Sequence, residues 1–319
     1  MGNCVKKQSR RDISPSDDAV TSTPASVSLH GSDACPVAAS LRLALLFKSV
    51  AVRFVPSDPS SPILLQCGPD AVSGDLDYLL RYIDGRFAGP PVVVRGPFSS
   101  GSPPLAAAVT IQHRSLGRLV DRAVEMAGDL TVGKGTRVGS PRGLGKLYSM
   151  LLEVLLEHAQ MEERIVFPAL ERANRGLSRI ATEEHARDLP IMNGIKEDIK
   201  AVGVMDSWTP AYQEALVDMV GRLRTLQENT RQHFMEEERD LLPLLEGEDE
   251  EEGVIDKCME VMESTHSHLF PFFISSLLPH EAMHYLSLLL RFCSNRVGLA
   301  STFRSLTAHM DALPPPTPS

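Results

Sequence analysis

One short pattern occurs twice in the chain, at residues 158–170 and again at 233–245. The two copies share a histidine, two adjacent glutamates, an arginine, a proline and a leucine at identical spacing. A lone histidine on an earlier helical segment precedes each copy, His113 before the first and His185 before the second. A duplicated pair of helices predicts a bundle of four antiparallel helices. From the periodicity of apolar residues we expect these helices over 105–128, 142–172, 177–202 and 210–245.

The helical spacing directs polar side chains toward the centre of this bundle. His158 and Glu162 lie one turn apart, as do His233 and Glu237, on faces that also carry apolar residues. An isolated histidine on such a face is usually an ordinary core residue, but buried carboxylates without partners are costly. Four imidazoles and two carboxylates therefore indicate a metal site, with the candidate ligands His113, His158, Glu162, His185, His233 and Glu237. Nitrogen and oxygen donors without thiolates suit iron, with manganese or zinc as alternatives.

This set of residues resembles the hemerythrin-like (HHE cation-binding) domain proteins of plants. The resemblance implies an up-down four-helix bundle around a non-haem diiron centre. It also implies that the four histidines are terminal ligands and that Glu162 and Glu237 bridge the two irons. The neighbouring Glu163 and Glu238 point about 100° further round the helix. We therefore expect these two glutamates not to bind metal, but to lie around the ligands or on the surface.

Two further features of the sequence bear on the function that this resemblance implies. Oxygen-carrying members of the family use an additional histidine, and the corresponding helix positions here have none. The resemblance therefore favours a sensing or regulatory protein, responding to iron, oxygen or redox state, over an oxygen carrier. Residues 266–282 resemble the segment that follows hemerythrin repeats in BRUTUS-type plant iron-sensing ubiquitin ligases. The five cysteines are scattered, which excludes the zinc-binding and RING modules of those ligases.

The N-terminal part predicts a small α/β unit over residues 27–95. Strands are expected at 27–30, 50–55 and 62–65, and helices at 35–46 and 75–84. This order resembles the thioredoxin-like half of glutathione S-transferases. The resemblance implies a candidate reactive thiol at Cys35, at a helix start where amides and the helix dipole stabilise a thiolate. It also implies a cis peptide bond at Pro62 and an acidic glutathione contact at Asp75, although Leu76 replaces the serine that usually follows.

The composition excludes several other classes of protein. Apolar residues make up 43% and charged residues 23%, so most of the chain can bury a core. An aromatic share of 5% and a net charge of −9 count against a nucleic-acid-binding protein. No apolar run approaches the roughly 18 residues of a membrane span. The five cysteines form no CxxC pair, so we expect a reducing compartment such as the cytoplasm.

The remaining segments flank or connect these units, and the whole is predicted to be an α+β multidomain chain. The expected divisions are a tail over 1–26, the α/β unit over 27–95, a linker over 96–104, the bundle over 105–246, a helical extension over 254–310 and a Pro-rich tail over 311–319. The acidic run 248–252 is expected to be a solvated loop between the bundle and the extension.

The first residues form a candidate acylation signal. Gly2 can accept myristate once Met1 is removed, and Cys4 can take a second acyl chain. The nearby Lys6 and Lys7 add attraction to anionic lipids. These features predict that a cytoplasmic protein associates with the plasma membrane through its N-terminus.

Three functions remain open from the sequence. The first is an iron-binding sensor or regulator whose ligands are metal ions and O2. The second is an enzyme, either a glutathione- or thiol-dependent one that uses Cys35 or a diiron enzyme acting on peroxide or nitric oxide. The third is a membrane-tethered adaptor whose protein partner the sequence does not name. The metal-ligand pattern favours the first, non-enzymatic function.

Overall fold

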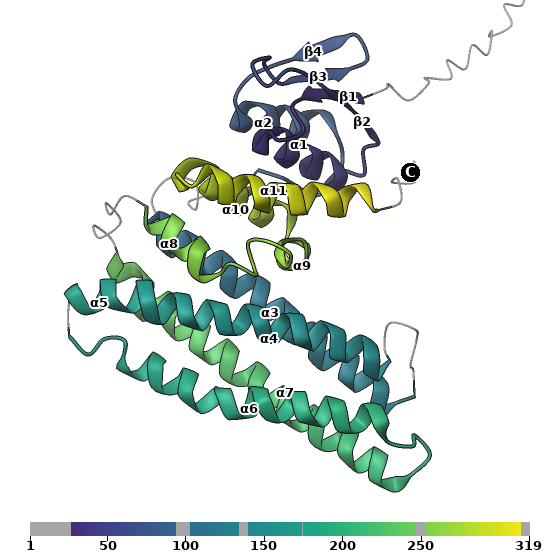
Figure 1. Ribbon diagram of the computed structural model, residues 1–319, viewed down its shortest axis with the longest axis vertical. Coiled ribbons are helices and arrows are strands. Elements are labelled where there is room, and N and C mark those ends of the chain that lie inside the picture. Colours follow the sequence, from purple (N-terminus) through teal and green to yellow (C-terminus); the bar gives the residue numbers. More distant parts are fainter. Residues whose placement is uncertain (1–26, 94–102, 134–139, 174, 246–252, 314–319) are drawn as a thin grey trace, which may run out of the picture.

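The computed structural model describes residues 27–93, 103–133, 140–173, 175–245 and 253–313. Figure 1 shows three layers: an N-terminal sheet with its helices, a middle layer of C-terminal helices, and a long four-helix bundle. The expected α+β fold class is confirmed. The candidate acylation sites Gly2 and Cys4 and the acidic run 248–252 lie outside the described residues.

The N-terminal layer contains a mixed four-stranded sheet in the order β2-β1-β3-β4. Strand β1 pairs in parallel with β2 and antiparallel with β3, and β3 continues as a hairpin into β4. The bounds are Val27–Gly31, Val52–Pro56, Leu64–Cys67 and Asp70–Val72 for β1 to β4. The sequence patterns did not predict β4, since it has only three residues. Gly68, whose φ of 63° lies in the left-handed region, begins the two-residue turn between β3 and β4.

Two helices complete this layer, α1 (Pro36–Phe47) and α2 (Leu76–Arg86). Pro36 occupies the first turn of α1 as predicted. The Asp75 side chain caps α2 by accepting a hydrogen bond from the Tyr78 amide at 2.8 Å. The predicted cis bond at Pro62 is wrong, because every peptide bond among the described residues is trans. The relation to glutathione S-transferases therefore stays a prediction, based on element order alone.

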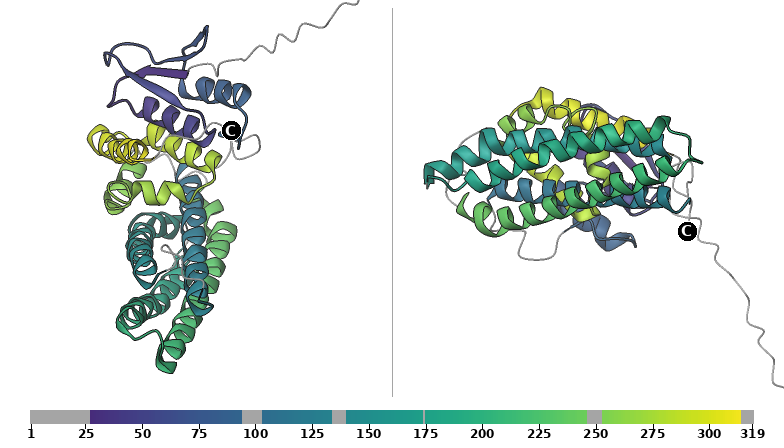
Figure 2. Two further views of the ribbon diagram at one scale, coloured as in Figure 1. Left: turned by 90° about the vertical axis from the view of Figure 1, so that its right-hand side faces the viewer. Right: turned by 90° about the horizontal axis from the view of Figure 1, so that it is seen from below.

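The bundle consists of four long helices in up-down order. They are α3 (Pro104–Thr131), α4 (Pro141–Met161), α6 (Arg179–Val204) and α7 (Pro210–Glu236). The Ser140 and Thr209 side chains cap α4 and α7, and a proline occupies the first turn of each. Helix α3 packs against α4 and α7, and α6 packs against the other side of both. The right-hand view of Figure 2 shows these helices lengthwise, from the side away from the N-terminal layer.

Both copies of the repeat contain a widened π-helical turn that the sequence analysis did not anticipate. The first, η2 (Glu162–Val166), continues into α5 (Phe167–Ala173), and the second, η3 (Glu237–Leu241), continues into the short 3-10 helix η4 (Leu242–Leu245). Each turn begins at a candidate bridging glutamate and ends just before the repeat's proline. A proline lacks the N–H of the α-helical ladder and clashes with the carbonyl four residues earlier. A widened turn can accommodate such a proline, although Pro190 stands inside α6 without one, and such turns often occur at functional sites.

The C-terminal helices lie between the sheet layer and the bundle. They are α8 (Val254–Val261), α9 (Phe270–Ser275), α10 (Pro279–Phe292) and α11 (Arg296–Asp311). Helices α10 and α11 pack against α1, while α8 packs against α4 and both α9 and α10 pack against α3. A single cluster of buried apolar side chains therefore joins Leu29 of the sheet, Leu286 of α10 and Leu116 of α3. None of the helices in the described ranges is long and apolar enough to span a membrane.

Candidate metal centre

The structure brings the six predicted ligands together in the middle of the bundle. His113 comes from α3, His158 and Glu162 from α4 and its π turn, His185 from α6, and His233 and Glu237 from α7 and its π turn. Five of the six are buried, with exposed fractions of 1–5%, and His185 is half-buried. Their donor atoms form two groups that can each hold a metal ion: His113, His158 and Glu162 in one, and Glu162, His185, His233 and Glu237 in the other.

Glu162 belongs to both groups and lies between them. Its Oε1 is 3.0 Å from His158 Nε2 and 3.2 Å from His113 Nε2. Its Oε2 faces the other way and lies 3.3 Å from His185 Nε2. Glu237 has a similar position, since its Oε2 is 3.4 Å from His113 Nε2 and 3.5 Å from His233 Nε2. Glu162, which directs one oxygen at each group, has the geometry of a bridging ligand, whereas a single oxygen of Glu237 faces both groups.

Each of the four histidines directs Nε2 at this centre and uses Nδ1 to bind an outer oxygen. His113 donates to Glu238 at 3.1 Å, His185 to Glu163 at 3.0 Å and His233 to Glu184 at 2.9 Å. His158 donates to the side-chain oxygen of Gln112 at 2.8 Å. Because carboxylate and amide oxygens only accept, each Nδ1 carries a proton, and each Nε2 is the nitrogen that would bind a metal ion once it has lost any proton of its own.

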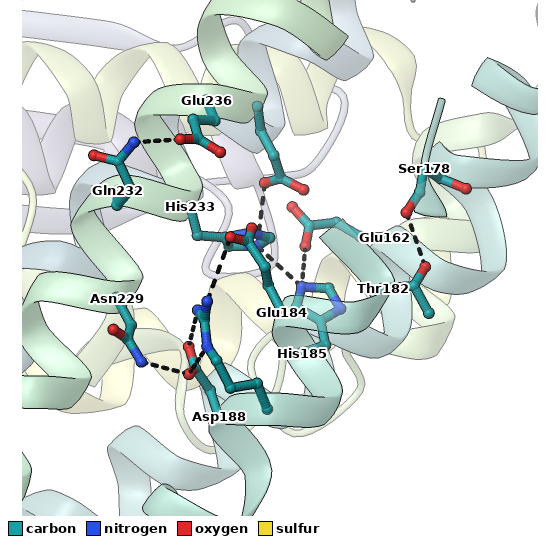
Figure 3. Close-up of polar contacts among 12 residues, drawn as sticks. Glu162, Ser178, Thr182, Glu184, His185, Asp188, Asn229, Gln232, His233 and Glu236 are labelled. Atoms are coloured by element: carbon teal, nitrogen blue, oxygen red, sulfur yellow. Dashed lines mark hydrogen bonds and ion pairs between the residues drawn. The ribbon is translucent and has the colours of Figure 1, made fainter. Parts of the chain in front are cut away.

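Two of these outer groups were predicted and two were missed. Glu163 and Glu238 were expected outside the ligand set, and they bind His185 and His113 respectively. Gln112 and Glu184 each precede a candidate ligand in the sequence, which was the available signal. Both reach a histidine on a different helix, so only the packing of the helices reveals the pairing. Figure 3 shows Glu184 directed at His233, with His185 and Glu162 beside them.

The buried polar atoms of the centre lack enough protein partners. Among the described residues, His158 Nε2, Glu162 Oε2 and both carboxylate oxygens of Glu237 are buried without a hydrogen bond. Leaving such atoms unpaired costs roughly 1–3 kcal/mol each, and more when they are charged. The Nε2 atoms of His185 and His233 are 3.0 Å apart. A metal ion bound by both rings would replace the hydrogen bond that these two nitrogens share. The residues present therefore fit a metal centre.

The same crowding shifts the acid–base behaviour of the metal-free protein. Burial opposes charge on His113, but Glu162, Glu237 and Glu238 together hold its pKa well above the usual value. Burial also opposes charge on Glu162, yet the facing imidazoles hold its pKa well below the usual range. Burial and the charge of Glu162 raise the pKa of Glu237. Protons shared among these groups thus partly neutralise the carboxylates, a role that a bound cation takes over.

The same part of the chain, residues 105–245, matches the family model described as the hemerythrin HHE cation binding domain. Residues 105–245 are a hemerythrin HHE cation-binding domain. No curated protein and no solved structure matches the chain. The hemerythrin domain covers the four bundle helices and both π turns, and it contains all six His and Glu residues of the two groups. The N-terminal sheet and helices α8–α11 lie outside it.

Other candidate residues lie away from this centre. Cys35 is half-buried at the start of α1, in the N-terminal layer. His266 is buried among the C-terminal helices, and His268 is exposed. His280 and His284, a possible zinc pair by spacing, line a cavity between α2 and α10. None of these residues belongs to a metal-capable group within the described part of the chain.

Two cavities reach the metal centre from opposite sides. One of about 380 Å³ lies between α4, α6 and α7 and is lined by His158, His185 and His233 together with apolar side chains such as Met192. The other, of about 500 Å³, lies between α3 and α7 and reaches His113. A cavity of this size is large enough for a small molecule to approach the ligands.

Proposed function

We propose that the hemerythrin domain holds two metal ions, iron in both positions, and that their occupancy makes the chain a sensor or regulator. The observation that carries this proposal is Glu162, which is 1% exposed and directs one oxygen toward each group of histidines. A bridging carboxylate needs two ions, and the neutral imidazole and carboxylate donors suit iron. His113, His158, His185 and His233 would be terminal ligands, with Glu162 and Glu237 between the ions.

The proposed regulatory role rests on how the centre is built into the bundle. Bound iron supplies a redox-active Lewis acid that responds to oxygen and to small ligands. The protein supplies the four oriented imidazoles, a shared carboxylate, and an apolar cavity of about 380 Å³ through which a small molecule can approach. Loss of the ions leaves charged groups buried at the contact of all four helices, so we expect the bundle to lose order with its metal.

Metal analysis of the purified chain tests this proposal. We expect about two irons per chain, with visible absorption from the coordinated iron, and a fall in helical circular dichroism when the metal is chelated. Loading with zinc or manganese in parallel identifies the preferred ion. A chain that takes up no metal, and whose helicity is unchanged by chelation, would contradict the proposal.

A further inference from the structure

A buried chain of hydrogen bonds leads from the metal centre into the C-terminal helices. His158 Nδ1 is 2.8 Å from Gln112 Oε1, and Gln112 Nε2 is 3.1 Å from the hydroxyl of Tyr285 on α10. That hydroxyl is 2.8 Å from His266 Nε2, and His266 Nδ1 is 3.0 Å from the Met262 carbonyl oxygen. Gln112 and Tyr285 are each 1% exposed and His266 is 4% exposed. The path is therefore shielded from bulk solvent.

The donor and acceptor of every hydrogen bond in this series follow from its last acceptor, the Met262 carbonyl oxygen. The Met262 carbonyl can only accept, so His266 carries its proton on Nδ1 and its Nε2 accepts from Tyr285. Burial lowers the pKa of His266 to about 4, which keeps the ring neutral. The Tyr285 hydroxyl then accepts from the Gln112 amide, so the amide oxygen of Gln112 faces His158. That oxygen requires a proton on His158 Nδ1, which leaves Nε2 as the metal donor.

This series of hydrogen bonds ends at His266, in a segment that is itself hydrogen-bonded to α4, the helix that carries His158. The carboxylate of Glu157 accepts hydrogen bonds from the amides of Ser264 and Thr265, both at 2.8 Å. These residues immediately precede His266, and the Thr302 hydroxyl donates to the His266 carbonyl. The turn that presents His266 is therefore anchored from α4 and from α11.

His158 differs from the other three histidines in the kind of group that orients its ring. His113, His185 and His233 are oriented by carboxylates of the bundle itself, on η3, η2 and α6. Among the described contacts, His158 is the ligand oriented by an amide, and that amide is oriented by residues outside the hemerythrin domain.

We propose that Gln112 and Tyr285 are positioning residues of the metal centre, so that the C-terminal helices set the orientation and the tautomer of His158. The inference rests on the proposed metal centre and adds to it a dependence on residues 254–310. Because coupling between two events is reciprocal, metal on His158 also stabilises the docking of α10 and the turn before α9. Metal occupancy is thereby transmitted toward α1, against which α10 packs.

The substitution Tyr285→Phe removes one hydroxyl and leaves Gln112 free to rotate. We expect the affinity for Fe²⁺, measured by competition with a chelator, to fall about 10-fold, as for other residues that orient metal ligands. The matched control is Tyr148→Phe on α4, where an equally buried hydroxyl donates to the Met192 carbonyl at 2.9 Å. Both variants should lose similar thermal stability, but only Tyr285→Phe should lose metal affinity. Equal affinity in the two variants would overturn the proposal.

Hydrogen exchange supplies a readout that does not depend on affinity. In the wild-type chain we expect metal to slow amide exchange over 262–292, and we expect this protection to disappear in Tyr285→Phe loaded with excess metal. Gln112→Leu should reproduce the result, which guards against a folding defect in one variant. Protection that persists in both variants would overturn the coupling. A wild-type chain that binds no metal would instead refute the proposed function, so the two failures are distinguishable.

Discussion

The two sides of the metal centre carry the same repeated motif but have different surroundings. The α3–α4 side, with His113 and His158, lies against the C-terminal helices, and both histidines are buried. The α6–α7 side, with His185 and His233, lies away from that layer, and His185 is half-buried beside the cavity. The motif thus supplies equivalent ligands, whereas the elements packed outside the bundle decide which ligand is exposed and which is tied to another layer.

The largest effect should come from removing the group that both sides share. We expect Glu162→Gln to lose metal from both groups, because it takes a ligand from each. A metal present at 100 times its Kd stabilises a protein by about 2.7 kcal/mol, and this metal-dependent gain should vanish in thermal unfolding. Glu183→Gln makes the same change at an exposed pair with Arg179 and should leave metal binding unaltered. Retention of one ion by Glu162→Gln would show that the two sides bind independently.

Exchanging the outer partners tests the difference between the sides directly. Glu163→Gln gives His185 an amide in place of its carboxylate, and we expect metal affinity to fall on the order of 10-fold. Gln112→Glu makes the opposite change at His158 and should raise the basicity of that ligand. Isothermal titration with Fe²⁺ or Mn²⁺ under anaerobic conditions measures the metal affinity of both variants. Equal responses to the two substitutions would mean that the outer partner is not what distinguishes the sides.

Acid should weaken the C-terminal layer through Asp256 of α8. The Asp256 carboxylate accepts hydrogen bonds from the amides of Ser294 and Asn295 at 3.0 and 2.9 Å, at the start of α11. Burial opposes its charge, but hydrogen bonds from the Cys293 thiol and the Ser294 hydroxyl, together with these two amides, lower its pKa to about 2. A carboxyl group whose folded-state pKa is depressed stabilises the fold above its unfolded pKa near 4 and loses that contribution as the pH falls toward 2.

We therefore expect Asp256→Asn to lower the thermal midpoint by a few degrees at pH 7 and to make no difference near pH 2. Thermal scans of the metal-free wild type and variant at a series of pH values between 7 and 2 measure the effect, because acid would release a bound metal from its imidazole and carboxylate ligands. A difference that stays constant with pH would argue that the lost hydrogen-bond geometry, not the carboxylate charge, is responsible.

The smallest effect is expected farthest from the centre. Cys35→Ser should leave metal content and metal-dependent stability unchanged, because Cys35 belongs to the N-terminal layer and to neither metal-capable group. Thiol labelling of the wild-type chain tests the thiol-enzyme alternative, for which a helix start favours a thiolate. Cys35→Ser is the control that lacks this thiol. Labelling of Cys35 at neutral pH that is much faster than for an ordinary thiol would favour that alternative, whereas slow labelling would count against it.

The bundle was largely predictable because its signals are local. The spacing of His158 to Glu162 and of His233 to Glu237 is one helical turn, and the predicted helices agree with α3, α4, α6 and α7 to within a few residues at most ends. The π turns were not anticipated: Pro168 and Pro243 follow them closely, but Pro190 stands inside α6 without such a turn, so a proline alone does not predict one. In the N-terminal layer the strands were displaced by one or two residues and β4 was missed, because short strands depend on their neighbours more than on their own pattern.

Local periodicity thus specified the four helices, the buried faces and the six candidate ligands, because residues one turn apart share a face whatever the rest of the chain does. The tertiary structure alone decided which oxygen orients each imidazole, since Gln112 and Glu184 act across helices. It also decided that the C-terminal helices lie between the sheet and the bundle and reach His158 through Tyr285. Contacts between residues 173 positions apart, such as Gln112 and Tyr285, have no signature in the spacing of either segment.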